Sequence, residues 1–313
     1  MSGRGVALYD VPAPAKINLF LHVTGRRDDG YHLLQTAFRF IGLCDTLDFD
    51  LRGDGLIVRE GEHIAGLAAE DDLVVRAARA LQKATGSPLG AQIRYQKRIP
   101  SGGGLGGGSS DAATTLIALN RLWQTRLTRA QLMQLALPLG ADVPVFIYGQ
   151  PAFAEGIGEL LAPLALPERA YLVVQPTQNV PTAEVFSSPD LTRDTPSVKM
   201  SVFTDWQTIN AARKGHAIPG LFGRNDLESV VFANYPRVHQ AAIWLEQQGL
   251  NARMTGSGAC FFVEFVTLDL AAVCQQEIIG KMRDRENDNA AAVQNAWACP
   301  GLHDHPLRHW TSS

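Results

Sequence analysis

The strongest chemical signal in the chain is a glycine-rich run with six glycines in the seven positions 102–108, followed by Ser109 and Ser110. An alternating segment, 92–99, predicts a half-exposed strand before it, and the Ala-, Thr- and Leu-rich segment at about 110–123 predicts a helix after it. Glycine has no Cβ, so its backbone N–H groups can approach an anion closely, and a helix N-terminus adds unpaired donors. We therefore expect a polyphosphate to bind here.

Other interpretations of this run fit less well. A flexible linker would rarely stop at a strong helix. Gly102, Gly104 and Gly107 match the dinucleotide spacing GxGxxG, but the preceding strand is half-polar and Leu127-Thr128-Arg129 stands where an acidic ribose ligand is expected about 20 residues later. A Walker loop would end in Gly-Lys-Ser/Thr, and the HRD and DFG motifs of protein kinases are absent from the sequence.

Two charged residues elsewhere are candidates for a chemical role. Lys16 lies in the alternating segment 15–23, which predicts a strand with Ile17, Leu19, Leu21 and Val23 on one face and Lys16, Asn18 and His22 on the other. Lys16 could supply positive charge, although an ordinary exposed strand lysine has the same pattern. Asp142 stands between a helix end and the apolar segment 143–148, predicted to be a strand, where an aspartate after glycine is also common turn chemistry.

Composition limits the class of protein. The 313 residues are 46% hydrophobic and 19% charged with a formal net charge of −3, so we expect a folded soluble chain that does not bind nucleic acid. No apolar stretch reaches the length of a membrane span, and the four cysteines form no CxxC pair. We therefore expect a cytoplasmic protein without a membrane partner, whose oligomeric state the sequence leaves open.

The pattern of elements suggests two domains. The first fifty residues predict antiparallel sheet, 71–81 predicts a helix, and Thr128 with Gln131 has the spacing of a capping box. The proline-rich segment 163–167 suggests a boundary near 165, giving domains 1–165 and 166–313. In the second domain we expect a strand at 171–175, an amphipathic helix at 233–248 and a strand at 260–265, after a polar, proline-interrupted stretch at 187–200.

Five motifs occur in order along the chain, namely Pro14-Ala15-Lys16-Ile17-Asn18-Leu19, Gly30-Tyr31-His32, the glycine run through Asp111-Ala112-Ala113, Gly140-Ala141-Asp142-Val143-Pro144 and Thr255-Gly256-Ser257-Gly258-Ala259. Taken together, and in this order, they resemble the GHMP kinase superfamily, which includes galactokinase and the homoserine, mevalonate and phosphomevalonate kinases. The resemblance implies an α+β, two-domain fold, with an N-terminal half like domain 2 of ribosomal protein S5 and a ferredoxin-like C-terminal half.

The resemblance also implies an activity, namely ATP- and Mg²⁺-dependent phosphorylation of an alcohol on a small molecule. The Lys-Ile-Asn-Leu, Gly-Tyr-His and Gly-Ala-Asp-Val-Pro segments point to the branch that phosphorylates the 2-hydroxyl of 4-diphosphocytidyl-2-C-methyl-D-erythritol in non-mevalonate isoprenoid synthesis. The alternatives are another GHMP kinase acting on homoserine or a sugar, and a catalytically inactive nucleotide-binding regulatory module.

Residue roles follow from the same resemblance. Asp142 would be the general base, and Lys16 beside it would favour the ionised carboxylate and polarise the same hydroxyl. The substrate would contact Asn18, Tyr31, His32, Thr182 and Phe186, and a turn at 255–259 would close the site. Ser109 or Ser110 would lie near Mg²⁺, but we identify no acidic metal ligand. The ATP phosphates would be wrapped by Pro100, Ser101, Gly102, Gly103, Gly104, Leu105, Gly106, Gly107, Gly108, Ser109 and Ser110.

The chain departs from the family pattern at two positions. Asp111 stands where relatives often have asparagine, and Asp72 stands where an asparagine is common near the adenine, which leaves the adenine contacts open. A cluster of His303, Asp304, His305 and His309 near the C-terminus could suggest a metal site, but family members end in a similar His-Pro-Leu segment, so we expect no metal there.

Overall fold

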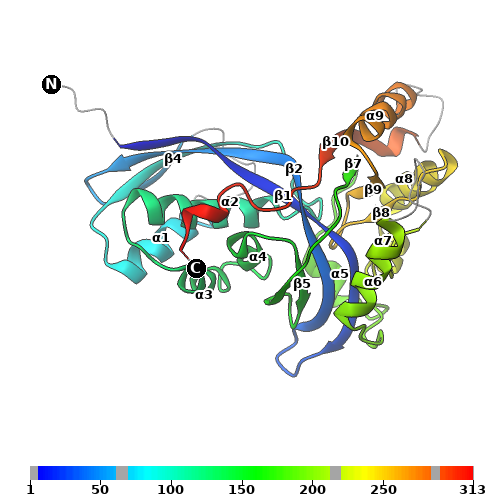
Figure 1. Cartoon of the computed structure of the whole chain (residues 1–313), viewed down its shortest axis with the longest axis horizontal. Helices are drawn as coiled ribbons and strands as arrows, with labels where there is room; N and C mark the ends of the chain where they lie inside the picture. The colour runs from blue at the N-terminus through cyan, green and yellow to red at the C-terminus, as the bar shows by residue number, and fades with distance from the viewer. Residues whose placement is uncertain (1–5, 61–69, 212–219, 283–289, 313) are drawn as a thin grey trace.

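The computed structural model describes residues 6–60, 70–211, 220–282 and 290–312, which form an α+β molecule with two sheets (Figure 1). The elements of the first part are β1 (Ala7–Arg26), β2 (His32–Arg52), β3 (Ile57–Glu60), α1 (Leu73–Thr85), β4 (Gly90–Gln96), α2 (Gly107–Leu122), α3 (Arg129–Ala136), α4 (Val143–Tyr148), β5 (Ala152–Glu155) and β6 (Leu160–Pro163). Those of the second part are β7 (Ala170–Pro176), α5 (Thr182–Ser187), α6 (Met200–Ala211), α7 (Glu228–Asn234), α8 (Pro236–Gln247), β8 (Arg253–Met254), β9 (Phe261–Phe265), α9 (Leu268–Met282), η1 (Ala290–Ala292), β10 (Val293–Pro300) and η2 (Arg308–Trp310).

The first sheet is built on the long antiparallel pair β1 and β2, as the alternating pattern of the first fifty residues predicted. One edge of β2 pairs with β1 along nearly its whole length. Its other edge is divided, because 46–52 pair with β4 and 36–38 pair with β5. β3 and β6 complete the sheet beside β4 and β5. The pair β1 and β2 therefore runs through the middle of the molecule (Figure 1).

The expected alternation of β1 fails beyond Asn18. Ile17 and Leu19 share one face, as predicted, and lie in a core formed with the second sheet, but Leu21 belongs to a different core and also lines the cavity described below. His22 does not join Lys16 and Asn18, because its Nε2 accepts a hydrogen bond from the backbone of Arg224 (3.4 Å). The pairing register of β1 with β2 shifts between Asn18 and Leu21, and such a bulge turns the following side chains to the other face.

The helices α1 to α4 cover one face of the first sheet and bury a common apolar core with it. The segment 143–148, predicted to be a strand, is the helix α4. Its six apolar residues are too few for periodicity to separate a strand from a buried helix. Pro144 suits the first helical turn, and Gly149, with a φ of 79°, ends the helix. The predicted capping box of Thr128 and Gln131 is present at the start of α3.

The second sheet is antiparallel, in the order β10-β7-β9-β8. Numbered within this half, the strands are in the order 4-1-3-2 with helices in the two crossovers, which is the expected ferredoxin-like arrangement. Both faces of the sheet are buried. On β7, Leu172 and Val174 face the helices of this half, whereas Tyr171 and Val173 face β1 and β2, which explains why the strand is apolar at successive positions.

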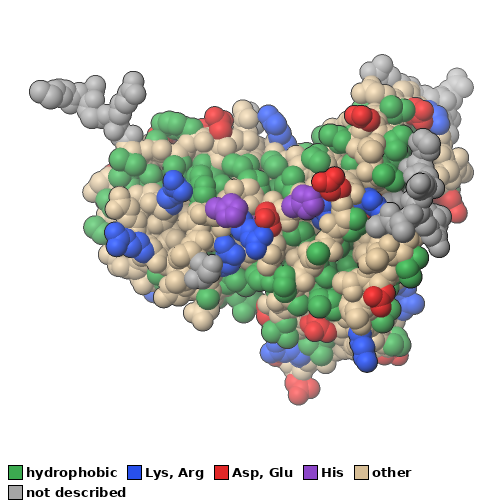
Figure 2. All heavy atoms as spheres, viewed as in Figure 1, with side chains coloured by type: hydrophobic (Ala, Val, Ile, Leu, Met, Phe, Trp, Pro, Cys, Tyr) green, Lys and Arg blue, Asp and Glu red, His purple; other side chains and the backbone are tan. Residues whose placement is uncertain are grey.

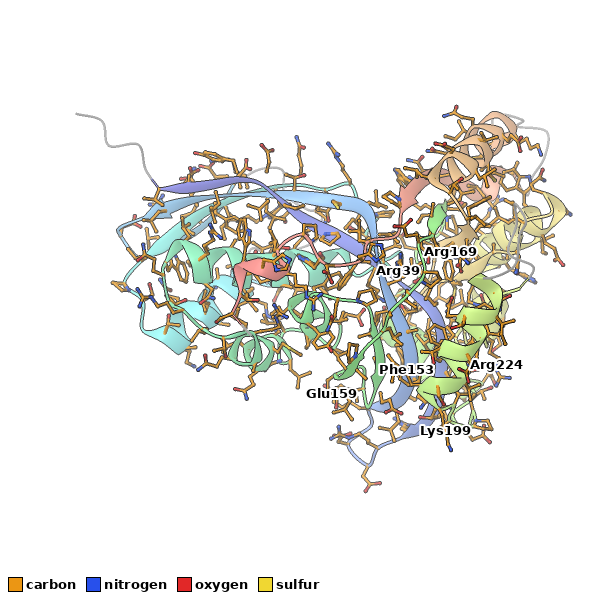
Figure 3. All side chains as sticks on the ribbon, in the orientation of Figure 1. Arg39, Phe153, Glu159, Arg169, Lys199 and Arg224 are labelled. Carbon is orange, nitrogen blue, oxygen red and sulfur yellow. The ribbon has the colours of Figure 1, made fainter. Side chains whose placement is uncertain are left out.

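The two halves of the molecule are in direct contact. Arg39 of β2 is buried at their junction and donates to the carbonyl of Pro167 (3.1 Å), close to Arg169 (Figure 3). The chain end then returns from β10 to pack Leu307 into the core of the first half (Figure 1). The predicted boundary near 165 falls between β6 and β7 and stays a prediction.

The face of the molecule shown in Figure 2 has no dominant charge. Acidic and basic side chains are interspersed over the face shown in Figure 2. In the part of the chain that the structure describes, no helix combines the length and apolar character needed to cross a bilayer.

Candidate active site

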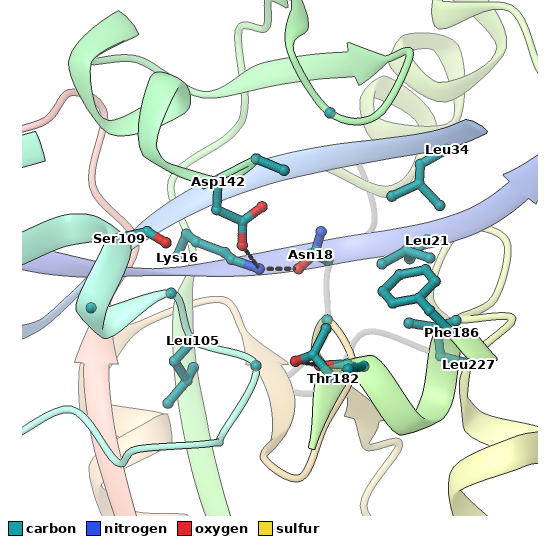
Figure 4. A pocket seen from close by; sticks show the side chains of 18 of the residues that line it. Lys16, Asn18, Leu21, Leu34, Leu105, Ser109, Asp142, Thr182, Phe186 and Leu227 are labelled. Carbon is teal, nitrogen blue, oxygen red and sulfur yellow. Dashed lines mark hydrogen bonds and ion pairs between the residues drawn. The ribbon is translucent and has the colours of Figure 1, made fainter. Parts of the chain in front are cut away.

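A cavity of about 810 Å³ lies between the glycine-rich loop, β1 and α5 (Figure 4). Leu105 and Ser109 mark one end, and Phe186 and Leu21 mark the other. Lys16 and Asp142 stand between these two ends. The cavity thus has room for two ligands that meet beside one charged pair.

Lys16 is the central residue of the cavity. Its Nζ lies 3.0 Å from Asp142 Oδ2 and donates to Asn18 Oδ1 at 2.7 Å (Figure 4). The Lys16 side chain is only 3% exposed, whereas that of Asp142 is 35% exposed and opens into the cavity. The lysine is therefore held in place by two oxygens, and the carboxylate keeps an accessible face on which a substrate hydroxyl could approach.

Three segments that are distant in sequence are tied together at Asn18. The backbone N–H of Asn18 donates to Thr255 Oγ1 (2.9 Å), and the Thr255 hydroxyl donates to the carbonyl of Gly104 (3.4 Å). The side-chain amide of Asn18 donates to Thr36 Oγ1 (2.9 Å). In addition, the backbone N–H of Lys16 donates to the carbonyl of Leu105 (2.9 Å). These bonds fix the glycine loop against the strand that carries the lysine.

The glycine loop is packed so closely that several side chains would not fit. A Cβ on Gly104 would lie 2.0 Å from the carbonyl oxygen of Thr255, and one on Gly103 would lie 2.7 Å from the sulfur of Cys260. A Cβ on Gly106, where φ is +71°, would lie 3.1 Å from carbons of the Lys16 and Phe146 side chains. The loop is thus held by the 255–260 turn on one side while its other side lines the cavity, as a phosphate cradle requires.

The helix α2 begins directly at this cradle. Gly106 precedes it in a left-handed conformation, and the first N–H groups of a helix have no acceptor within it. The two serines of the first turn differ in their surroundings. Ser110 is buried and donates its hydroxyl to the carbonyl of Pro14 (2.7 Å), whereas Ser109 lines the cavity. Of the two, Ser109 is the one that could contact a bound ligand.

A second cation lies at the same end. Lys97 lines the cavity, and its Nζ is 3.5 Å from the position that a Cβ on Gly107 would take. It forms ion pairs with Asp45 and with Asp111 (2.5 Å for the latter). Burial would lower the pKa of Lys97, but these two carboxylates raise it above its usual value. At Asp111 burial outweighs the attraction of Lys97 and raises the pKa to about 7.

The opposite end of the cavity is aromatic. Tyr31 is 59% exposed at the rim, and the rings of His32 and Phe186 lie 5.2 Å apart between centroids. Thr182 Oγ1 and Ser257 Oγ form a hydrogen bond of 2.7 Å between α5 and the 255–260 turn, and both residues line the cavity. This end could hold a planar base between apolar faces, with hydroxyls toward the centre.

The structure therefore brings together residues from all five motifs that the sequence analysis selected. Every residue predicted to bind ligand or to act in catalysis lines this cavity, except Ser110. Sequence analysis missed Lys97, whose only local signal is its position at the end of the strand before the glycine loop. It also missed Leu21, because the bulge in β1 cannot be recognised from alternation.

Two other sequence observations have structural explanations. Asp72 caps α1 by accepting from the N–H of Val74 (2.9 Å), and its carboxylate also contacts Tyr95 and Arg59 rather than the cavity. Near the C-terminus, His305 is buried against Phe40 and Phe146, whereas His303 is exposed. Among the described residues, no group of three or more His, Cys, Asp or Glu side chains is placed to hold a metal ion.

Comparison with known proteins identifies the family of the chain. The family model described as GHMP kinases N terminal domain matches residues 72–150, and the model described as GHMP kinases C terminal matches residues 210–301. A protein of Bordetella bronchiseptica named 4-diphosphocytidyl-2-C-methyl-D-erythritol kinase is 60% identical over 311 residues, covering 98% of this chain and all of that protein. One of the same name from Azoarcus is 55% identical over 296 residues, 95% of each chain.

Solved structures give the same result. A crystal structure described as 4-(cytidine 5′-diphospho)-2C-methyl-D-erythritol kinase superposes with a TM-score of 0.74 at 32% identity, covering 95% of this chain and 99% of that one. Homoserine kinase from Cytophaga hutchinsonii superposes with a TM-score of 0.66 at 14% identity, over 97% of each chain, and so shares the fold. The chain belongs to the GHMP kinase family, within its branch of 4-diphosphocytidyl-2-C-methyl-D-erythritol kinases.

Proposed function

We propose that the chain transfers the γ-phosphoryl group of ATP to the 2-hydroxyl of 4-diphosphocytidyl-2-C-methyl-D-erythritol. One observation carries this proposal, namely the Lys16–Asp142 pair (3.0 Å), which stands between a glycine cradle and an aromatic pocket in a single cavity. A phosphate donor and an alcohol acceptor bound at the two ends would meet at this pair. The names and high identity of the relatives support the choice of acceptor.

The donor would occupy the glycine loop. The N–H groups of the loop and of the first turn of α2 suit the oxygens of a triphosphate, and the helix dipole favours its negative charge. Lys97, beside Gly107, adds a cation at this end. Phosphoryl transfer depends on such positioning and charge stabilisation more than on covalent chemistry.

Mg²⁺ would accompany the nucleotide. Mg²⁺ in phosphoryl-transfer sites is held largely by phosphate oxygens and waters, with one or two protein ligands, so a site without a cluster of carboxylates can still accept it. Among the described residues at the glycine-loop end, the hydroxyl of Ser109 fits this role, since the Ser110 hydroxyl is bonded to Pro14. When bound, Mg²⁺ would neutralise part of the charge on the transferring phosphate.

The acceptor would place its cytosine among Tyr31, His32 and Phe186 and its methylerythritol near Asn18 and Asp142. Thr182 and Ser257 lie between these positions, where the diphosphate would pass. With the 2-hydroxyl at Asp142, the carboxylate accepts its proton as the oxygen bonds to the γ-phosphorus and the bond to the ADP oxygen breaks. Lys16 holds Asp142 in place and stabilises the negative charge between the two reactants.

The test is an ADP-release assay with Mg·ATP that compares the cytidylated methylerythritol with homoserine, mevalonate and galactose. We expect turnover with the cytidylated acceptor alone. Turnover with another of these alcohols would keep the family but overturn the proposed substrate. ATP binding without turnover on any of the four would instead support a regulatory nucleotide-binding module.

A further inference from the structure

An arginine outside the cavity forms a hydrogen bond with the histidine at the aromatic end of the cavity. Arg193, in the segment after α5, donates from Nε to His32 Nε2 at 3.0 Å. The other two nitrogens of the same guanidinium donate to the backbone carbonyls of Ser188 (2.6 Å) and Leu191 (2.9 Å). These two bonds fix the orientation of the guanidinium. Arg193 does not line the cavity, whereas His32 does.

This bond decides which nitrogen of His32 carries the proton. A guanidinium has only donors and stays protonated in proteins, so Nε2 must present its lone pair to Arg193 and the ring proton must be on Nδ1. Burial, and then the charges of Arg193 and of Arg26 from β1, lower the pKa of His32, which favours the neutral ring. These two cations are the charged groups that act on the ring.

The Nδ1–H group is available for a ligand. Nδ1 of His32 makes no hydrogen bond to any residue in the described part of the chain, and it is not among the fully buried polar atoms that lack a partner. The ring lies against Phe186, and the residue is 8% exposed, on the cavity side. His32 therefore presents one N–H donor of fixed identity to whatever base lies beside Phe186.

We propose that Arg193 is a positioning residue that holds His32 as an Nδ1–H donor and thereby makes the site select cytosine over uracil. This rests on the proposed function, which places the acceptor's base at this end of the cavity. The pairing edge of cytosine offers acceptors at N3 and O2, whereas N3 of uracil carries a hydrogen. The fixed Nδ1–H of His32 can donate to N3 of cytosine. With uracil this N–H would face the N3–H of the base, and neither donor would have an acceptor.

The test compares the wild type with Arg193→Met, which keeps the length of the side chain but removes the donors. Binding of cytidine 5′-diphosphate and of uridine 5′-diphosphate is measured by titration calorimetry. We expect the wild type to prefer the cytidine nucleotide and Arg193→Met to lose roughly 10- to 100-fold of that preference, the cost of one mispaired buried polar group. Arg193→Lys, which retains a donor, should recover part of it, and Arg79→Met on the exposed face of α1 should change nothing.

Two further measurements separate this role from simple support of the loop. In ¹⁵N-labelled protein, with His32→Asn used for assignment, NMR should show Nδ1–H in the wild type and a mixture of tautomers in Arg193→Met. Lowering the pH until NMR shows that the His32 ring is protonated should restore cytidine binding to Arg193→Met, because the protonated ring again carries Nδ1–H. An Nε2–H wild type, or an equal loss of affinity for both nucleotides without rescue at low pH, would overturn the proposal.

The design also separates this proposal from the proposed function. If the chain does not act on a cytidylated acceptor, neither nucleotide will bind preferentially to the wild type, although NMR can still report the Nδ1–H tautomer. If the function is right and the inference wrong, the cytidine preference will be present and will survive Arg193→Met.

Discussion

Lys16 has two oxygen partners, Asn18 and Asp142, and they contribute differently. The amide oxygen of Asn18 orients the ammonium group, while the carboxylate of Asp142 balances its charge. Because Lys16 is buried, the loss of Asp142 would leave a buried charge without a counterion. A neutral isostere that keeps an oxygen at the same position is therefore the cleanest probe of the carboxylate's chemistry.

For this reason we expect Asp142→Asn to bind ATP with little change in affinity but to lose turnover. Removing a general base typically lowers the rate by about 10²- to 10⁴-fold. ADP release measures kcat, and calorimetry with ATP measures binding. Asp205→Asn, at an exposed position on α6, is the matched control and should retain full activity. Unchanged kcat in Asp142→Asn would remove Asp142 from the catalytic role.

The raised pKa of Asp111 predicts how the free energy of unfolding depends on pH. Its carboxyl has a pKa of about 7 in the folded chain, because burial outweighs the attraction of Lys97, against a usual value of 3.8. Between these two values the folded chain holds a proton that the unfolded chain releases, so the free energy of unfolding falls as the pH rises. Asp111→Asn removes this titration, because an amide cannot ionise.

The stability of Asp111→Asn relative to the wild type should therefore increase between pH 5 and pH 8. Urea unfolding of both proteins at the two pH values measures this difference. A difference that stays constant, or that shrinks as the pH rises, would show that Asp111 is ionised in the folded chain throughout this range.

At the scale of elements, the site depends on the junction between the glycine loop and α2. The loop is held by hydrogen bonds from the 255–260 turn, where the N–H of Ala259 donates to Gly102 and that of Cys260 to Gly103 (both 3.1 Å). Gly106 then reverses the backbone so that α2 begins with its N–H groups at the cavity. Two elements from different halves of the chain thus fix the surface that we propose binds the phosphates.

We expect Gly106→Ala to damage this junction in two ways. A left-handed conformation costs a residue with a Cβ roughly 1–2 kcal/mol, and the added methyl would press on Lys16 and Phe146. Both stability and ATP affinity should fall, and kcat should fall with them as Lys16 moves. Thermal unfolding and ATP titration report these effects.

Gly280→Ala is the control for that substitution, since Gly280 lies in α9 with open space around its Cα and no positive φ. It should preserve activity and leave stability equal or slightly higher, as expected for alanine inside a helix. If Gly106→Ala behaves like Gly280→Ala, the loop does not require a left-handed residue at this position.

At the scale of the whole molecule, the chain end connects the two halves. After β10, the N–H of His305 donates to the carbonyl of Gly149 (2.9 Å), and Leu307 is buried in the core formed by the first sheet and its helices. Arg121 of α2 lies over the ring of Trp310 (4.7 Å to its centroid). The last residues thereby pack against α2, which begins at the glycine loop, and α4, which begins directly after Asp142.

Leu307→Ala should consequently destabilise the molecule by about 2–5 kcal/mol, the usual range for a leucine truncated in a core. Leu160→Ala is the matched control, because Leu160 is 61% exposed on β6 while Leu307 is 2% exposed. Urea unfolding measures both variants. Equal, small effects would mean that the chain end is not part of the core of the first half.

The sequence by itself determined the glycine loop that leads into a helix, the order of the motifs, the capping box of α3 and the family, because each depends on residue types at short fixed spacings. The tertiary structure decided that 143–148 is a helix, that β1 turns over after Asn18 and that Ser109 rather than Ser110 faces the cavity. It alone placed Arg193 against His32, 161 residues away in sequence. These features depend on bulges, burial and contacts between distant segments. The free energies of such interactions cannot be inferred from residue types at short spacings.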